Sequence, residues 1–336
     1  MVSFAQWLLQ KAREDEVDRL YFLSREGKII KQVYDYWSEG EKNAPKSDYL
    51  EISRRAAGVA AIFALDDVLD IARTTYFPNT LENFLNTRYG LNLSDKRWSE
   101  LAESPGWNRT VVVSVQDRKI EHLIPLFQTL EAEIKAVAQK ERLALLRYLN
   151  DKGLNFDDHQ AVVDIGYGGS VQGYMNRLLS PKVHGYYLMT DERSVKVAEN
   201  YNVIIRGCFF ENIKQSSNAP IMHRHSFDLE KLLSTNDPQI EHYEVDITGN
   251  MNEHYRDLSI AEIECADIRN RLMDGAMDYA KDAKRIRTTM LPDFQPSCWT
   301  AKMLMETFLI KHSQSETDLL SKIVLDDYYC GRGLVA

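Results

Sequence analysis

Two short polar segments of this chain each follow an apolar run and carry residue types that bind anions. The first segment, residues 24–27, follows residues 20–23, and the second, residues 166–170, follows residues 161–165. We expect each apolar run to form a buried strand and each polar segment to form the loop that leads into a helix. The start of a helix offers free backbone N–H groups and the positive end of the helix dipole, which together favour phosphate. Two such loops on neighbouring parallel strands predict a site for a ligand with two phosphate groups.

The second loop has the composition of a phosphate cradle. Gly166, Gly168 and Gly169 let the backbone approach a ligand without a clash of Cβ atoms. Ser170 and the amides that follow it can bind the phosphate. Asp164, at the end of its strand, can accept hydrogen bonds from two sugar hydroxyls. The competing interpretation is a tight turn between strand and helix whose glycines serve packing alone.

The first loop and the end of a second strand add arginines. Arg25 can contact a phosphate, and the amides of Glu26 and Gly27 face the same space. Arg54 and Arg55 follow another apolar strand and add two guanidinium groups, which suit bidentate phosphate contacts. Taken singly, each of these segments also fits a surface turn with solvated charges. Together, three such strand ends favour an anion site.

A third polar run, residues 222–230, is expected to be a loop that returns near this site. It carries three side chains that could meet an acceptor, namely Arg224, Asp228 and Glu230. His223 and His225 have a spacing found in zinc sites, but no third ligand stands at a convincing distance, so we expect no metal site built by the protein. Two acidic pairs, residues 66–67 and 326–327, are expected to be helix caps or exposed carboxylates.

Composition excludes several classes of protein. The 336 residues are 44% hydrophobic and 27% charged, which is typical of a globular chain with a large core. The net charge is −9 and no block of Lys and Arg stands out, so a nucleic-acid surface is not expected. No run of 18 apolar residues predicts a membrane span, and the first residues do not resemble a signal peptide. The four cysteines are far apart, which favours reduced thiols in a cytoplasmic protein.

The elements that must position these residues follow an alternating pattern. Apolar runs at residues 20–23, 49–52, 161–165 and 183–189 alternate with helical patterns, and a fifth strand is expected near residues 203–210, interrupted at Gly207. This alternation predicts an α/β fold with a parallel sheet flanked by helices. Ligands of such sheets bind at the carboxyl ends of the strands, where the polar loops lie.

The stretch between the second and third strands has a different texture. Residues 56–158 look mainly helical, apart from a strand at 111–115, and they are too long for an ordinary connection. One long helix is predicted from an apolar face with steps of four and three residues, formed by Leu123, Phe127, Leu130, Ile134 and Val137. We interpret this stretch as a large helical insertion. From residue 216 onward the chain is expected to be mostly helical.

These segments resemble a known family. Residues 162–170 resemble a shortened phosphoribosyl-diphosphate loop of the type I phosphoribosyltransferases, and residues 23–27 resemble their diphosphate loop. A closer resemblance is to a domain found beside phosphatase-like modules in bacterial polysaccharide-assembly proteins. That domain carries Phe-Leu-(Ala/Ser)-Arg-(Asp/Glu)-Gly, then Ser-Arg-Arg, then Val-Asp-Ile-Gly-x-x-Gly-(Ser/Thr)-x-Gln. The counterparts here are residues 22–27, 53–55 and 163–172.

The resemblance covers about the first 60 residues and residues 155–215, and it implies an organisation of the chain. Residues 1–55 and 159–215 would form a phosphoribosyltransferase-like core. Residues 56–158 would be the helical insertion, serving as a lid or acceptor region, and residues 216–336 would complete the acceptor site. Because the chain starts so close to its first strand, we expect it to be a piece of a longer protein.

Some members of that group resemble ribofuranosyl glycosyltransferases. The implied reaction moves 5-phosphoribosyl from phosphoribosyl diphosphate to a glycan acceptor of a bacterial surface polysaccharide, either O-antigen or capsule, and releases diphosphate. The implied partners are a lipid-linked acceptor, a phosphatase domain or subunit, and Mg²⁺ held mainly by the donor diphosphate. The implied location is cytoplasmic, at the inner face of the membrane.

The resemblance also assigns roles residue by residue. Donor binding would fall to Ser24, Arg25, Gly27, Arg55, Gly166, Gly168, Gly169 and Ser170. The catalytic group would comprise Asp164, Glu26, Arg54 and Glu230. Arg54 and Arg55 would neutralise the charge that grows on the leaving diphosphate. Glu26, Asp228 or Glu230 would take the acceptor's proton.

One departure from the family keeps two alternatives open. Ile165 replaces the second acidic residue of the phosphoribosyl-diphosphate loop, and the loop is a residue or two short. A non-catalytic binding or regulatory module with the same fold is therefore a second hypothesis. A methyltransferase that uses S-adenosylmethionine is a third, because Asp-x-Gly-x-Gly also begins such loops, although the full Gly-x-Gly-x-x-Gly does not occur.

Overall fold

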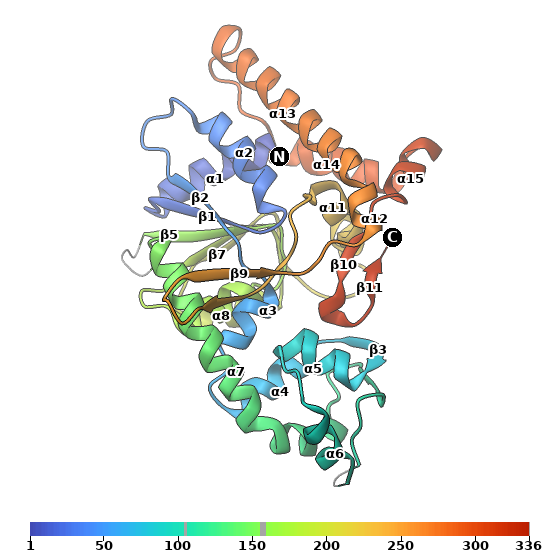
Figure 1. Cartoon of the computed structure of the whole chain (residues 1–336). Helices are drawn as coiled ribbons and strands as arrows, with labels where there is room; N and C mark the ends of the chain where they lie inside the picture. The colour runs from blue at the N-terminus through green and yellow to red at the C-terminus, as the bar shows by residue number, and fades with distance from the viewer. Residues whose placement is uncertain (104–105, 155–158, 336) are drawn as a thin grey trace.

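A five-stranded parallel sheet forms the centre of the computed structural model, which describes residues 1–103, 106–154 and 159–335. Its strands run in the order β2 (Lys46–Leu50), β1 (Arg19–Leu23), β5 (Gln160–Asp164), β6 (His184–Asp191) and β7 (Ile205–Ile213) (Figure 1). The first four coincide with the strands expected from sequence within three residues at either end. The predicted α/β fold with a parallel sheet flanked by helices is confirmed.

Helices cover both faces of this sheet. Along β1, Leu20 and Phe22 belong to the core on one face, whereas Tyr21 and Leu23 belong to the core on the other, because strand side chains alternate. The first face is covered by α1 (Val2–Glu14), α2 (Gly27–Ser38), α13 (Ala266–Thr289) and α14 (Cys298–Lys311). The second is covered by α3 (Arg54–Ala60), α8 (Ser170–Leu178) and the last part of α7 (Ile124–Asp151).

The strand order places the two glycine-bearing loops side by side. From β1 the chain moves to the edge strand β2 and then returns to build β5, β6 and β7 on the other side of β1. The neighbours β1 and β5 are in register, with Phe22 beside Val163. Their carboxyl ends therefore flank the point at which the strand order reverses, which is where open parallel sheets bind ligands.

Between β2 and β5 the chain builds a mainly helical segment around its own apolar core. After α3, it contains α4 (Leu65–Ala72), α5 (Leu81–Tyr89), α6 (Asp95–Glu103), the 3₁₀ turn η1 (Glu121–Leu123) and α7. The predicted long helix is α7, and its apolar face is buried in this core. The predicted strand is β4 (Val112–Val115), which pairs with the unpredicted β3 (Tyr76–Thr80). Residues 155–158, at the end of the expected insertion, lie outside the described residues.

The remainder of the chain contains helices and two hairpins that the sequence pattern did not predict. Besides α13 and α14, its helices are α10 (Ile221–Arg224), α11 (Ser226–Leu233), α12 (Ile260–Glu264) and α15 (Gln314–Leu320). The hairpins are β8 (Ile240–Val245) with β9 (Met251–Tyr255), and β10 (Leu325–Asp327) with β11 (Gly333–Val335). The 3₁₀ turn η2 (Tyr328–Cys330) connects the second pair.

The expectation of an interrupted fifth strand is wrong. After β6, α9 (Arg193–Tyr201) leads into β7, which runs through Gly207 without a break. A bulge accommodates this glycine, because Tyr187 pairs with Gly207 but Met189 pairs with Phe210. A Cβ atom at Gly207 would collide with the carbonyl oxygen of Phe210, so the bulge requires glycine.

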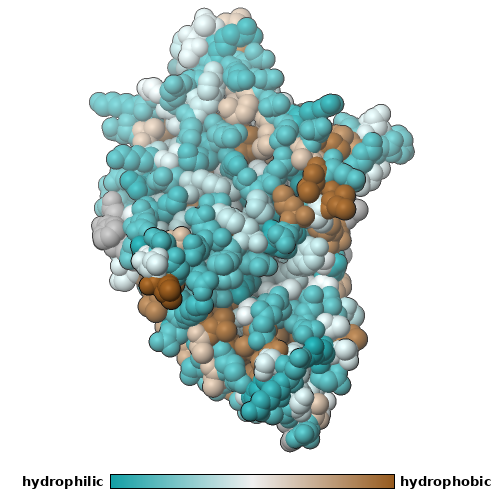
Figure 2. Space-filling view, viewed as in Figure 1, coloured by the Kyte–Doolittle hydropathy of each residue, from teal (hydrophilic) through white to brown (hydrophobic). Residues whose placement is uncertain are grey.

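The surface in the orientation of Figure 1 is mainly hydrophilic, with apolar side chains in small groups (Figure 2). In the described parts of the chain, no helix has both the length and the apolar character that a membrane crossing needs. The four cysteines are free thiols.

Candidate functional site

A cavity of about 190 Å³ lies at the carboxyl ends of β1, β2 and β5. Most of the predicted site residues line it, although they come from four separate parts of the chain. They are Ser24, Arg25, Glu26, Arg54, Arg55, Asp164, Gly166 and Glu230. The structure thus brings together the three strand ends that the sequence singled out, and adds Glu230 from α11.

Local hydrogen bonds fix the loops that carry these residues. The Ser24 hydroxyl donates to the carbonyl oxygen of Ile52 (2.8 Å) and accepts from its N–H (3.0 Å), which joins the ends of β1 and β2. Ser53 caps α3, because its hydroxyl accepts from the N–H of Ala56 (3.0 Å). This cap places Arg54 and Arg55 in the first turn of the helix, at the cavity. Two peptide bonds in these loops, Ser24–Arg25 and Gly166–Tyr167, are cis.

The three arginines have different partners. The partly buried guanidinium of Arg55 pairs with Glu141 and donates to the carbonyl oxygen of Glu241 (2.9 Å). A second, Arg25, lies 4.0 Å from a carboxylate oxygen of Asp326. Arg54 lies over the ring of Tyr329, and no carboxylate of the described residues forms an ion pair with it. Arg54 therefore offers the cavity a positive charge that is open to an anionic ligand.

Carboxyl groups crowd the same cavity. Burial raises the pKa of Asp164 well above its usual value, and the charges of Glu26 and Glu230 raise it further. Burial, followed by the charge of Glu26, raises the pKa of Glu230 to about 7. Asp164 also accepts a hydrogen bond from the N–H of Ile165 (2.8 Å). Such crowding disfavours ionisation, so hydroxyl donors or a cation would be stabilised here.

The sequence missed a contribution from the end of the chain. Asp326, Asp327, Tyr329 and Cys330 all line the cavity, because the turn after β10 closes over it. The expectation that Asp326 and Asp327 are exposed is wrong: their side chains are 1% and 15% exposed, and Asp326 accepts from Arg256 Nε (2.9 Å). Asp326 also accepts from the N–H of Tyr328 at the start of η2 (3.0 Å), so the expected capping role holds for this residue. An acidic pair directly after the apolar residues 323–325 is the signal that would have found them. The expectation for residues 66–67 holds at Asp67, which accepts from the N–H groups of residues 63 and 64 at the start of α4.

The remaining predicted donor residues are Gly168, Gly169 and Ser170 of the second loop and Gly27, the last residue of the first. Gly168 and Ser170 line another cavity, of about 600 Å³, together with Arg118, Arg193 and Lys196. The loop that carries Gly166 therefore borders two cavities, and the second is also lined by the carboxylates of Asp70 and Glu192. Gly169, the cap residue before α8, has a φ of +67°, which favours glycine. A Cβ atom at Gly27 would lie 2.8 Å from the carbonyl carbon of Phe22, so this glycine lets α2 pack closely against β1.

The polar run at residues 222–230 is helical, not the expected loop. It forms most of α10 and α11. Glu230 faces the cavity, whereas Asp228 pairs with His225 (3.2 Å) and Arg224 donates to the carbonyl oxygen of Ala219 (3.0 Å). Among the three candidates for the acceptor's proton, Glu26 and Glu230 are therefore the two that line the cavity.

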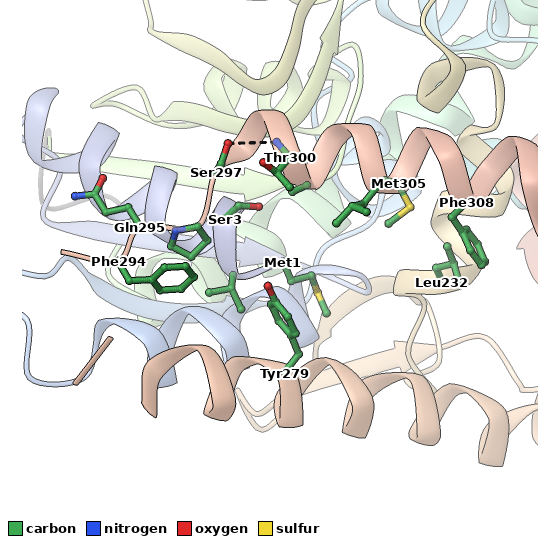
Figure 3. A pocket seen from close by; sticks show the side chains of 14 residues that line it. Met1, Ser3, Leu232, Tyr279, Phe294, Gln295, Ser297, Thr300, Met305 and Phe308 are labelled. Atoms are coloured by element: carbon green, nitrogen blue, oxygen red, sulfur yellow. Dashed lines mark hydrogen bonds between the residues drawn. The ribbon is translucent and has the colours of Figure 1, made fainter. Parts of the chain in front are cut away.

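A different, apolar cavity of about 600 Å³ lies between α1, α13 and α14. Tyr279 from α13, and Met305 and Phe308 from α14, extend toward it, with Met1 at its side (Figure 3). Ser297 caps α14 at its edge by accepting from the N–H of Thr300 (3.2 Å). Its lining holds none of the charged groups described above.

Comparison with known proteins assigns the chain to no family. A scan of protein-family models gave no match, and a search of curated proteins gave none either. The geometry of the charged cavity is therefore the basis for a functional proposal.

Proposed function

We propose that the chain is a glycosyltransferase that moves 5-phosphoribosyl from phosphoribosyl diphosphate to a glycan acceptor and releases diphosphate. The observation that carries the proposal is the convergence of three strand-end loops on one cavity at the reversal point of a parallel sheet. That cavity has guanidinium groups for an anion and carboxyl groups for hydroxyls. We infer that the sheet belongs to the phosphoribosyltransferase-like class.

The proposed donor spans the two cavities beside the second loop. Its diphosphate lies against residues 24–27 and Arg54, and its ribose hydroxyls donate to Asp164. Its 5-phosphate lies at residues 168–170, at the start of α8, where Arg118 and Lys196 line the second cavity. The separation of Gly166 from Ser170 into neighbouring cavities suits a ligand with phosphate at both ends.

The reaction breaks the bond from the anomeric carbon to the diphosphate oxygen, and the electron pair leaves with diphosphate. An acceptor hydroxyl oxygen forms the new bond, and its proton passes to a carboxylate. Glu230 is the preferred base, because a pKa of about 7 suits proton transfer at neutral pH. Arg54 stabilises the charge that grows on the leaving group, an interaction that strengthens in the transition state.

Magnesium would be held mainly by the diphosphate of the donor. The carboxyl groups of Glu26, Asp164 and Asp327 line the cavity but do not converge closely enough to form a metal site by themselves. When bound, the ion would neutralise part of the diphosphate charge.

The acceptor and the biological setting are proposed from the resemblance alone. The acceptor is a lipid-linked glycan of a bacterial O-antigen or capsule, at the cytoplasmic face of the inner membrane. A phosphatase domain or subunit would remove the 5-phosphate after transfer.

The test is incubation with phosphoribosyl diphosphate, Mg²⁺ and candidate glycans, with products identified by mass. We expect one phosphoribosyl group per acceptor, and a loss of about 100-fold or more in Asp164→Asn and Gly169→Val. The Asn variant should stay folded, because it removes a carboxyl group whose ionisation burial disfavours. Asp228→Asn is the matched control, since Asp228 does not line the cavity. Full transfer by Asp164→Asn would exclude the assignment.

A binding module without catalysis is the second candidate, and one observation favours it. Ile165 occupies the position of the family's second acidic residue, and its side chain is buried at 4% exposure, so it contributes no polar group to a ribose. This candidate predicts that phosphoribosyl diphosphate raises the melting temperature of the wild-type chain while no glycan is modified. Transfer to any glycan would exclude it.

A further inference from the structure

The β8–β9 hairpin brings two imidazoles and a carboxylate together outside the candidate site. His242 and Glu244 are two residues apart on β8 and so share a face, and His254 pairs with His242 across the hairpin. Their ligand atoms all lie within 4.8 Å of one another. In the described parts of the chain, this is the one place where three His, Cys, Asp or Glu residues converge so closely.

One buried nitrogen of each imidazole in this cluster forms no hydrogen bond. The two rings are parallel, with centroids 4.3 Å apart. His242 Nδ1 is buried, and no group of the described chain forms a hydrogen bond with it. His254 Nε2 is also buried, and its polar neighbour is Glu244 Oε2 at 3.2 Å. Buried ring nitrogens without partners are unfavourable, so a bound cation would satisfy what the chain does not.

Lys140 holds the carboxylate of Glu244, and a cavity lies beside it. Lys140 bonds the other oxygen of Glu244, Oε1, which leaves Oε2 facing His254. A cavity of about 260 Å³ is lined by His242 and Glu244, and also by Asn86 and Asn92. The cavity is large enough for a water molecule as a further ligand.

We propose that His242, Glu244 and His254 bind a divalent transition metal such as Zn²⁺, with one coordination position open to the adjacent cavity. Two imidazole nitrogens and one carboxylate oxygen form a ligand set typical of zinc and its neighbours, whereas Mg²⁺ prefers oxygen ligands alone. The site is distinct from the magnesium of the proposed transfer reaction. By joining β8 to β9, the metal fixes the backbone at Glu241, to which Arg55 donates.

The experiment measures metal binding by the whole chain after treatment with a chelator. We expect one Zn²⁺ per chain by calorimetry, a rise in melting temperature with Zn²⁺, and no such rise with Mg²⁺. Co²⁺ should give the visible absorption of a site with low coordination number. His254→Gln and Glu244→Gln should each lower the affinity for Zn²⁺ about 100-fold.

Two control variants distinguish this metal site from binding at other histidines or at cysteines. His225→Gln removes a histidine outside the cluster, and Cys298→Ser removes the thiol that lies 3.5 Å from Cys208. Both should bind Zn²⁺ like the wild type. Circular dichroism checks that every variant is folded. Absence of stoichiometric Zn²⁺ binding, or binding that survives His254→Gln but is lost in Cys298→Ser, would overturn the proposal. Neither readout depends on glycosyl transfer.

Discussion

Glu230 is the residue whose ionisation should control the proposed reaction. Its pKa of about 7 follows from burial and from the charge of Glu26. A carboxyl group accepts a proton only when ionised, so kcat/KM should fall about tenfold for each pH unit below 7. Glu230→Gln should be slow and lack this dependence, whereas Asp228→Asn on the same helix should keep it. Measurement of kcat/KM from pH 5 to 9 checks this, and an unchanged acidic limb in Glu230→Gln would assign the base to another group.

The same raised pKa makes a prediction about stability. Because the pKa of Glu230 is about 7 when folded against an ordinary value of 4.5, the folded chain binds this proton more tightly than the unfolded chain. Its stabilising effect is complete below pH 4.5 and is lost as the pH rises to about 7. The difference between the two pKa values corresponds to about 3 kcal/mol, and remaining solvent contact reduces this to roughly 2 kcal/mol.

Urea denaturation of the wild type and of Glu230→Gln at pH 5 and pH 8 measures this effect. Relative to the variant, the wild type should lose roughly 2 kcal/mol of unfolding free energy between the two values. Subtraction of the variant removes the contributions of titratable groups that do not interact with Glu230. A difference that is constant with pH would show that the proton is bound equally in both states.

The sequence predicted the site residues that directly follow strands of the sheet. It missed the site residues that come from the end of the chain. Arg25, Arg54 and Asp164 could be grouped because parallel strands end at one edge of a sheet. Asp326 and Tyr329 reach the same cavity from the end of the chain, through packing that no local pattern encodes. Glu230 was selected for its polar neighbours, although the helix that presents it was expected to be a loop.

Among the elements, β1 and α2 pack closely against each other at Gly27. A Cβ atom at Gly27 would lie too close to the backbone of Phe22. Phe22 is part of β1, which is paired on both sides in the sheet, so its backbone cannot move away. Gly27→Ala should therefore lower the free energy of unfolding by roughly 1–3 kcal/mol. Gly275→Ala is the matched control, because nothing lies within 4 Å of a Cβ atom there and alanine favours helix, by up to about 1 kcal/mol. Chemical denaturation should show opposite signs for the two, and a neutral Gly27→Ala would mean that α2 shifts freely.

Strands were predicted correctly where apolar residues form a continuous run, and they were missed where charged residues interrupt that run. β1 and β5 are apolar along most of their length because both faces of the central sheet are covered. β8 reads Ile-Glu-His-Tyr-Glu-Val, and its partner β9 carries Asn, Glu and His. This hairpin buries Ile240 and Tyr243 in the core on one face of the sheet. Its many polar residues explain why the sequence pattern did not predict two strands here.

At the scale of the whole molecule, the candidate site depends on how the helical segment holds the end of the chain. Arg88 on α5 is fully buried. Its guanidinium donates to the carbonyl oxygens of Tyr329 (2.6 Å), Ile71 (2.9 Å) and Thr75 (2.7 Å). It also lies over the ring of Tyr329, 4.2 Å from the ring centre. One side chain thus connects the segment between β2 and β5 to the turn that closes the cavity.

Arg88→Met should therefore loosen the site as well as the fold. It leaves buried carbonyl oxygens without donors, at about 1–3 kcal/mol each, so the unfolding free energy should fall by about 3 kcal/mol or more. Arg73→Met is the matched control, because Arg73 forms an exposed pair with Asp70 three residues away, whose loss should change the unfolding free energy by less than about 0.5 kcal/mol. Hydrogen exchange should show faster exchange at residues 325–335 in Arg88→Met, and the affinity for phosphoribosyl diphosphate should fall with it. Unchanged protection of those residues in a destabilised variant would show that the turn is held by Arg256 and its carboxylate partners rather than by Arg88.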